Sequence, residues 1–85
     1  MTLTESNPTG TGQVTTLDAK GLKCPMPIVK TAQAIKNVSS GDLLEVLTTD
    51  PGAVADFAAW SRSTGNELVE QTIADGVYRF VLRRK

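Results

Sequence analysis

The chain has 85 residues, with nine Lys or Arg balanced by nine Asp or Glu, 40% hydrophobic residues, one cysteine and no histidine. This length allows one domain at most, and the balanced charge gives no reason to expect nucleic acid or an anionic membrane as the main ligand. One cysteine without histidine excludes an internal disulfide, a metal site of the usual Cys and His type, and a Ser-His or Cys-His nucleophile pair.

The first twelve residues, MTLTESNPTGTG, are rich in Thr, Gly, Ser and Asn and have no apolar period. We expect residues 1–12 to form a disordered tail, followed by one folded domain over residues 13–85. The N-terminus lacks the basic start and apolar block of a signal peptide, and no run of about 18 apolar residues predicts a membrane span. A cytoplasmic protein is therefore expected, which also suits a single unpaired cysteine.

The first expected elements are a strand and a helix. Residues 14–19, VTTLDA, contain β-branched residues with a rough period of two, which predicts a strand that Lys20 and Gly21 interrupt. From Pro25 the period changes to that of a helix, which the sequence NVSSGD then ends. Five apolar residues are spaced as one face of this helix, namely Ile28, Val29, Ala32, Ile35 and Val38.

A second strand and helix follow. Residues 42–49, DLLEVLTT, are apolar on both faces, as in a central strand. Asp50 is a candidate N-cap for the next helix, and Pro51 is expected at its first position. The Ala-rich segment Ala53–Ser63 predicts that helix, and Gly65 ends it.

Two strands complete the chain. The alternating sequences ELVEQTIA (67–74) and VYRFVLRR (77–84) flank Asp75-Gly76, which is typical of a two-residue hairpin turn. The order is therefore β-α-β-α-β-β. A helical connection makes the first two strands parallel, whereas the hairpin is antiparallel. We expect an α+β fold, a two-layer sandwich in which a four-stranded mixed sheet carries both helices on one face.

The sequence GLKCPMPIVK places the only cysteine, Cys24, directly before the first predicted helix. Proline is tolerated in the first turn because the N–H groups there have no partner within the helix. Pro25 and Pro27 are therefore expected at the first and third helical positions, with Cys24 as the N-cap. The prolines would also stiffen the turn and hold the sulfur in one place.

This placement would favour the thiolate form of Cys24. The positive end of the helix dipole, the N–H groups of Met26 and Ile28, and the nearby Lys20 and Lys23 would all act to lower the thiol pKa. Free cysteine is otherwise often a small buried hydrophobe. The position at a helix start favours a reactive thiol over that alternative.

The sequence GLKCPMP resembles the Cys-Pro-x-Pro signature of the TusA/SirA/YedF family of small sulfur-transfer proteins. The likeness runs from about Val14 to Arg83 and includes, in order, LDAKGLKCPMPIVKT, LLEVLTTDPGAVADFAAW and STGNELVE. The resemblance implies the same βαβαββ fold as the residue patterns do. It also implies that no cofactor is used.

The resemblance further implies a sulfurtransferase that relays sulfur through one thiol. Cys24 would accept sulfane sulfur from a cysteine desulfurase or a rhodanese-like donor, hold it as a persulfide and hand it to an acceptor protein. Lys23, Pro25, Met26 and Pro27 are the supporting residues of this site. Thiolation of tRNA, molybdenum cofactor assembly and sulfur oxidation are all compatible pathways, and no direct contact with nucleic acid is expected.

The chain departs from many relatives at two positions. Those relatives carry a second cysteine after the aromatic residue of the second helix and a histidine after its closing glycine, where this chain has Ser61 and Asn66. Relay through one thiol needs neither residue. A function that relies on a pair of cysteines is placed in doubt.

Two other functions stay open from the sequence alone. The first is a non-catalytic regulatory or RNA-binding module in which the Cys-Pro-x-Pro turn is only a helix cap, although balanced charge and few aromatic residues argue against it. The second is a thiol peroxidase or redox sensor, which would need a resolving thiol from another chain.

Four further residues have competing interpretations. Asp18 is expected at a solvent-facing strand end rather than in the site, and Asp50 is expected as a helix cap rather than a catalytic group. Trp60 is expected to pack its helix rather than to dock a partner. Met26 is either an exposed contact for donor or acceptor or a residue that fills a gap.

Overall fold

The computed structural model describes residues 13–23 and 25–85. The expected disordered tail over residues 1–12 lies outside the described residues, and so does Cys24 itself. The elements are, in order, β1 (Val14–Asp18), α1 (Met26–Ala34), the 3₁₀ turn η2 (Ile35–Asn37), β2 (Leu43–Thr48), α2 (Ala53–Thr64), β3 (Glu67–Ala74) and β4 (Val77–Arg83). The predicted order is confirmed, and α1 gains a short 3₁₀ end.

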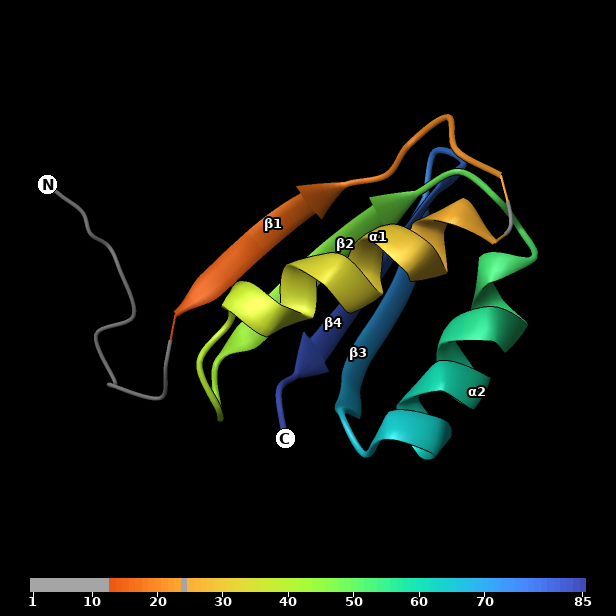
Figure 1. The fold of residues 1–85 in the computed structure, drawn as a ribbon. Coiled ribbons are helices and arrows are strands. Elements are labelled where there is room, and N and C mark those ends of the chain that lie inside the picture. Colours follow the sequence, from red (N-terminus) through yellow and green to blue (C-terminus); the bar gives the residue numbers. More distant parts are fainter. Residues whose placement is uncertain (1–12, 24) are drawn as a thin grey trace, which may run out of the picture.

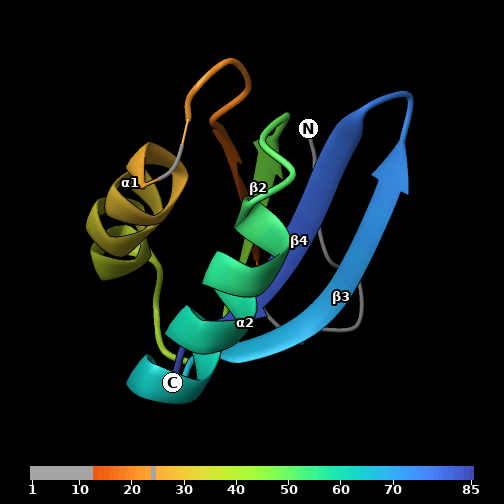
Figure 2. The same ribbon diagram turned by 90° about the vertical axis from the view of Figure 1, so that its right-hand side faces the viewer.

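The four strands form one mixed sheet in the order β1-β2-β4-β3. β1 pairs with β2 in parallel, while β4 pairs with β2 and β3 in antiparallel fashion. Both helices cover the same face, as Figures 1 and 2 show. The predicted two-layer α+β sandwich is therefore confirmed. Within the described ranges, neither α1 nor α2 has the length and apolar content needed to cross a membrane.

The core lies between the helices and the two central strands. Leu44 and Val46 of β2 and Phe80 and Leu82 of β4 are fully buried. Phe57 of α2 is fully buried against them, and its ring stacks on that of Phe80 with 4.4 Å between centroids. Burial of two aromatic rings and the aliphatic residues around them supplies the main hydrophobic stabilisation of a domain this small.

The buried face of α1 differs from the predicted one. Val29 was expected to face the core, but its side chain is 39% exposed. The helix begins at Met26 and turns Pro27, Thr31 and Ile35 toward the sheet. Val29 lies two residues from Pro27 and Thr31, about half a turn, and therefore points away. Thr31 is tolerated in the core because its hydroxyl donates a 2.8 Å hydrogen bond to the carbonyl of Pro27.

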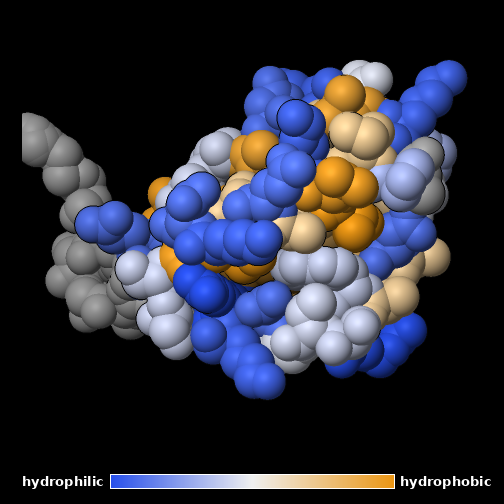
Figure 3. All heavy atoms as spheres, viewed as in Figure 1, coloured by the Kyte–Doolittle hydropathy of each residue, from blue (hydrophilic) through white to orange (hydrophobic). Residues whose placement is uncertain are grey.

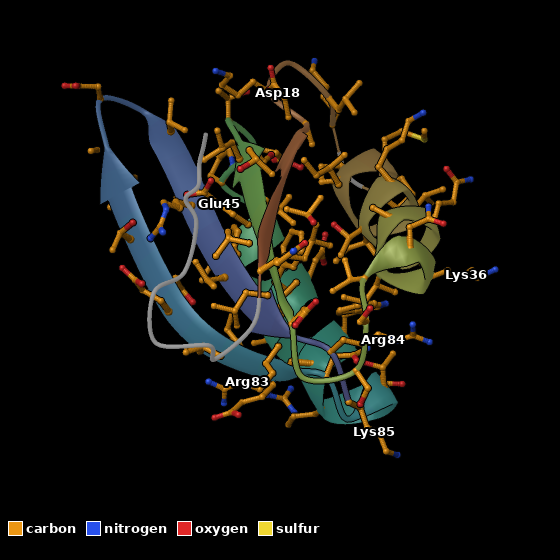
Figure 4. All side chains as sticks on the ribbon, turned by 90° about the vertical axis from the view of Figure 1, so that its left-hand side faces the viewer. Asp18, Lys36, Glu45, Arg83, Arg84 and Lys85 are labelled. Atoms are coloured by element: carbon orange, nitrogen blue, oxygen red, sulfur yellow. The ribbon has the colours of Figure 1, made fainter. Side chains whose placement is uncertain are left out.

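The face of the sheet without helices carries a network of charged side chains. The Glu45 carboxylate accepts hydrogen bonds from Arg79 Nε and, at 2.8 Å, from the Thr16 hydroxyl. Arg79 Nη1 also lies 2.9 Å from Glu70 Oε2, so the network joins all four strands. Figure 4 shows Glu45 on this face, with Arg83 farther along the sheet. The pKa of Glu45 is lowered, first by the bond from Arg79 and next by the bond from Thr16.

This lowered pKa predicts a pH-dependent stability. The folded state favours the carboxylate of Glu45, so its contribution is fully present above the unfolded pKa, near 4.5, and is lost as the pH falls through the lower folded value. Glu45→Gln should therefore lower the urea midpoint at pH 7. We expect the gap from the wild type to close as the pH falls below about 4.5.

Asp75→Asn, which removes one negative charge at the hairpin tip outside the network, is the matched control. A gap between the wild type and Glu45→Gln that stayed constant from pH 7 to pH 3 would contradict the assignment.

Candidate functional site

Two loops lie next to each other at the end of the sheet where strands β1 and β2 end. The first spans residues 19–25 before α1, and the second spans residues 49–52 before α2. The two strands are parallel neighbours, so their carboxyl ends lie side by side. Figures 1 and 2 show both loops, and the turn between β3 and β4, at this end of the molecule. We call this end the site edge; Cys24 belongs to the first loop by sequence.

Hydrogen bonds from backbone N–H groups anchor the first loop to β2 and to the second loop. The Ala19 N–H donates to the carbonyl of Leu47 at 2.7 Å, which continues the parallel ladder past the end of β1. The Gly21 N–H donates to the Thr49 hydroxyl at 3.0 Å. Gly21 has φ of 83°, a left-handed conformation that costs other residues energy and glycine almost nothing. The loop is thus tied once to β2 and once to the second loop before it reaches Cys24.

Asp18 supports the same turn. Its side chain is exposed, and its carboxylate accepts a 3.0 Å hydrogen bond from the N–H of Lys20. A short acidic side chain that bonds the backbone two residues ahead is a common way to stabilise a turn. Asp18 therefore acts as the strand-end residue expected from the sequence, with a local structural role.

The start of α1 differs from the predicted start by one residue. The N-cap is Pro25, not Cys24, and the helix begins at Met26, so Pro27 occupies its second position. The N–H of Met26 donates to the carbonyl of Lys23 at 2.8 Å. The first helical bond runs from Val29 to the Pro25 carbonyl at 3.0 Å. Pro25 is exposed, whereas Pro27 is buried.

The second loop is a turn rather than the start of a helix. Its Asp50 carboxylate accepts a 3.0 Å bond from the Gly52 N–H, and the Asp50 N–H donates to the Thr48 hydroxyl at 3.2 Å. The N-cap of α2 is Gly52, so the prediction of Asp50 as N-cap and Pro51 as first helical residue was wrong by two positions. The carboxylate satisfies the N–H of a residue in the turn.

A basic and partly apolar surface adjoins the first loop. Met26 and Val29 are 40% and 39% exposed, and Lys23 and Lys30 beside them are exposed as well. Figure 3 shows hydrophobic atoms gathered over α1 among hydrophilic side chains. Residues 19–41 contain four lysines and no Asp or Glu, although the whole chain is neutral. We call Lys23, Met26, Val29 and Lys30 the α1 surface; the exposure of Met26 favours a contact role over gap filling.

Three other residues have structural roles. Trp60 is partly buried against the core, as expected for a helix-packing residue. The Ser61 hydroxyl donates to the Asn66 carbonyl at 2.6 Å and accepts from the Leu68 N–H at 3.2 Å. The Asn66 side-chain carbonyl accepts from the Lys85 N–H at 2.8 Å. Ser61 and Asn66 therefore fasten the C-terminal end of α2 to β3 and to the end of the chain.

Sequence patterns missed one residue of the site edge, Thr49. Its hydroxyl accepts a hydrogen bond from Gly21 in the other loop. The spacing of residues within one helix or strand does not predict a contact between two loops. The adjacent Thr48 is fully buried. The alternation of buried and less buried side chains along β2 is the feature that predicts that its side chain points into the core. No three His, Cys, Asp or Glu side chains group as metal ligands within residues 13–23 and 25–85.

Comparisons with known proteins agree on one family. A sequence model of the family described as Sulfurtransferase TusA matches residues 15–84. YrkI of Bacillus subtilis is 50% identical over 68 residues, which cover 80% of this chain and 91% of YrkI. The sulfur carrier protein TusA of Allochromatium vinosum is 44% identical over 68 residues, which cover 80% of this chain and 90% of that protein.

A solved structure shares the fold. A SirA-like protein from Desulfitobacterium hafniense superimposes with a TM-score of 0.72 at 20% sequence identity, over 84% of this chain and 96% of the other. At this identity the likeness speaks for the fold alone.

The contact between Gly21 and Thr49 leads to a test of loop anchoring. Thr49→Val removes the hydroxyl that accepts from the Gly21 N–H, so we expect faster hydrogen exchange at the Gly21 amide with little change in global stability. Nuclear magnetic resonance measures this exchange residue by residue. Thr64→Val, at the far end of α2, is the control and should leave Gly21 unchanged. Equal exchange rates in both variants would contradict the anchoring.

Proposed function

This chain belongs to the Sulfurtransferase TusA family of sulfur carrier proteins, and we propose that it works by accepting sulfane sulfur on Cys24 and passing it to another protein. The donor is a cysteine desulfurase or a rhodanese-like protein that presents a persulfide. The acceptor is a second protein with a reactive thiol. We place this relay in the cytoplasm, where a reducing environment regenerates a lone thiol.

The proposed transfer is an exchange at divalent sulfur. The Cys24 thiolate attacks the terminal sulfur of the donor persulfide. A new S–S bond forms at Cys24, the S–S bond of the donor breaks, and the donor thiolate leaves with the electron pair. The same exchange in the opposite sense passes the sulfur to the acceptor and restores the Cys24 thiolate. Sulfur moves without net oxidation, so the protein acts as a sulfurtransferase and needs no cofactor.

The observation that carries this proposal is the anchored loop in front of α1. Cys24 directly precedes Pro25, which caps the helix, and the positive end of a helix dipole favours an anion nearby. The loop residues before it are fastened to β2 through Ala19 and to Thr49 of the second loop through Gly21. A fixed loop presents a nucleophile in one place and lowers the entropy cost of each transfer. Because the sequence has one cysteine, no second thiol of this chain can discharge the persulfide.

The α1 surface supports a specific kind of partner. Its lysines and partly exposed Met26 and Val29 adjoin the loop that contains Cys24. An apolar centre with a charged rim is the usual layout of a docking surface. We infer that donor and acceptor dock on residues 20–27, the α1 surface and the start of α2, with a complementary acidic rim around an apolar contact.

Loading of sulfur is the direct test of the proposal. Incubation of the reduced protein with a cysteine desulfurase and cysteine, or with a low-molecular-weight persulfide, should add the mass of one sulfur atom to the intact protein. Cys24→Ser should abolish the gain. The double variant Cys24→Ser, Ser63→Cys moves the thiol to an exposed position at the end of α2, and we expect it to load far more slowly from the protein donor.

Intact-mass spectrometry over time measures all three proteins. A wild-type mass that stays unchanged with every donor would refute the proposal. Equal loading of the double variant by the protein donor would show that the position of the thiol does not matter.

Charge reversal on the docking surface gives a second test. Lys23→Glu should lower the rate of loading from a protein donor on the order of tenfold at low salt, because electrostatic attraction speeds encounter. Lys36→Glu is the matched control; Lys36 lies in η2, and Figure 4 shows it far from Asp18. Loading from a small persulfide should be nearly the same in both variants. Equal rates with the protein donor would contradict docking beside Lys23.

A further inference from the structure

β3 forms the outer edge of the sheet, on the side opposite β1. It is eight residues long, seven of which are exposed, and Ile73 is the most exposed large hydrophobic residue of the described chain, at 60%. A shift in register between Leu68 and Glu70 interrupts its pairing with β4 near the start. The following stretch, Gln71–Ala74, is regular and uncharged. A regular edge without charges or proline is open to pairing with another strand.

The register of the hairpin fixes which backbone groups of β3 face outward. Ala74 and Val77 flank the two-residue turn and pair with each other, and in such hairpins the flanking residues exchange both of their hydrogen bonds. Along an antiparallel strand, inward and outward groups alternate. The N–H and C=O groups of Ala74 and Thr72 therefore face β4, while those of Ile73 and Gln71 face outward.

We propose that β3 pairs antiparallel with β3 of a second copy of this chain, about a twofold axis at Thr72. In this register Gln71 lies opposite Ile73 of the second copy, and Ile73 lies opposite its Gln71. The four outward N–H groups and four outward C=O groups of the two strands then form four hydrogen bonds. Two four-stranded sheets become one sheet of eight strands.

Side-chain charges fit this register. Gln71 and Ile73 point to the same face as the helices, because their partners on β4, Phe80 and Tyr78, do so. Glu70 lies opposite Ala74 of the second copy on the other face, so no two like charges meet across the new pair. The exposed Ile73 side chain gains a neighbour and loses contact with water.

The dimer would leave both site edges open. The turn between β3 and β4 lies at the site edge, and antiparallel pairing directs the two turns toward opposite ends of the joined sheet. Docking of a sulfur donor or acceptor is therefore independent of the dimer. One pair of strand segments buries little area, so the dimer should be weak and its share should rise with protein concentration.

Cross-linking tests the register. In a Cys24→Ser background, Thr72→Cys places two thiols across the axis, where Cα atoms of a pair without backbone hydrogen bonds lie about 4.5 Å apart, within the range of a disulfide. Mild oxidation should convert Thr72→Cys to a covalent dimer several times faster than Thr15→Cys, an exposed position on the other edge strand. Equal, slow cross-linking of both would overturn the proposal.

Sedimentation velocity under reducing conditions tests the dimer without cross-links. The wild type should shift from monomer toward dimer as concentration rises. Ile73→Lys should shift this equilibrium to monomer, and Val14→Lys, which changes a 53% exposed residue on β1, should not. A wild type that stays monomeric at the highest soluble concentration, or a dimer lost in Val14→Lys but kept in Ile73→Lys, would refute the proposal.

Discussion

The parallel pairing of β1 with β2 is the constraint on which the rest of the structure depends. Parallel neighbours need a connection that crosses from one end of the sheet to the other, and α1 makes this crossing. The carboxyl ends of the two strands therefore lie together, and so do the loops that lead into α1 and α2. The hydrogen bond from Gly21 to the Thr49 hydroxyl joins these loops directly. One pairing thus fixes both the crossing of α1 and the anchor of the loop that contains Cys24.

Much of the fold follows from local patterns in the sequence. β2 was expected in the centre of the sheet because both of its faces are apolar, and it lies between β1 and β4. Asp75-Gly76 predicted the hairpin, and both residues have positive φ, as the turn requires. Gly65 ends α2 in the left-handed conformation that its position suggested. In each case a short segment contains the complete physical reason for its structure.

The details that the sequence did not predict depend on contacts between distant segments or on the exact start of a helix. A helix that begins at Met26 turns Thr31 toward the core and Val29 toward solvent. The spacing of apolar residues alone predicts that Val29 faces the core. Asp50 is predicted as an N-cap because aspartate is a preferred residue at that position. In the structure its hydrogen bond from Gly52 completes a turn that ends before α2 begins. The role of Thr49 arises only when two loops meet. The position at a helix start favoured a reactive thiol over a buried one, and the family resemblance added the expectation that Cys24 is the sulfur-transfer site.

We propose sulfur transfer at the site edge and self-association at the outer strand β3, and the transfer depends on Cys24. The most direct test is the release of sulfur from loaded protein that has been purified away from its donor. Cyanide removes sulfane sulfur as thiocyanate, so we expect one equivalent of thiocyanate per loaded chain and the return of the protein to its unloaded mass. Loaded protein that keeps its added mass, or loses it without forming thiocyanate, would contradict the claim that Cys24 holds a transferable sulfur.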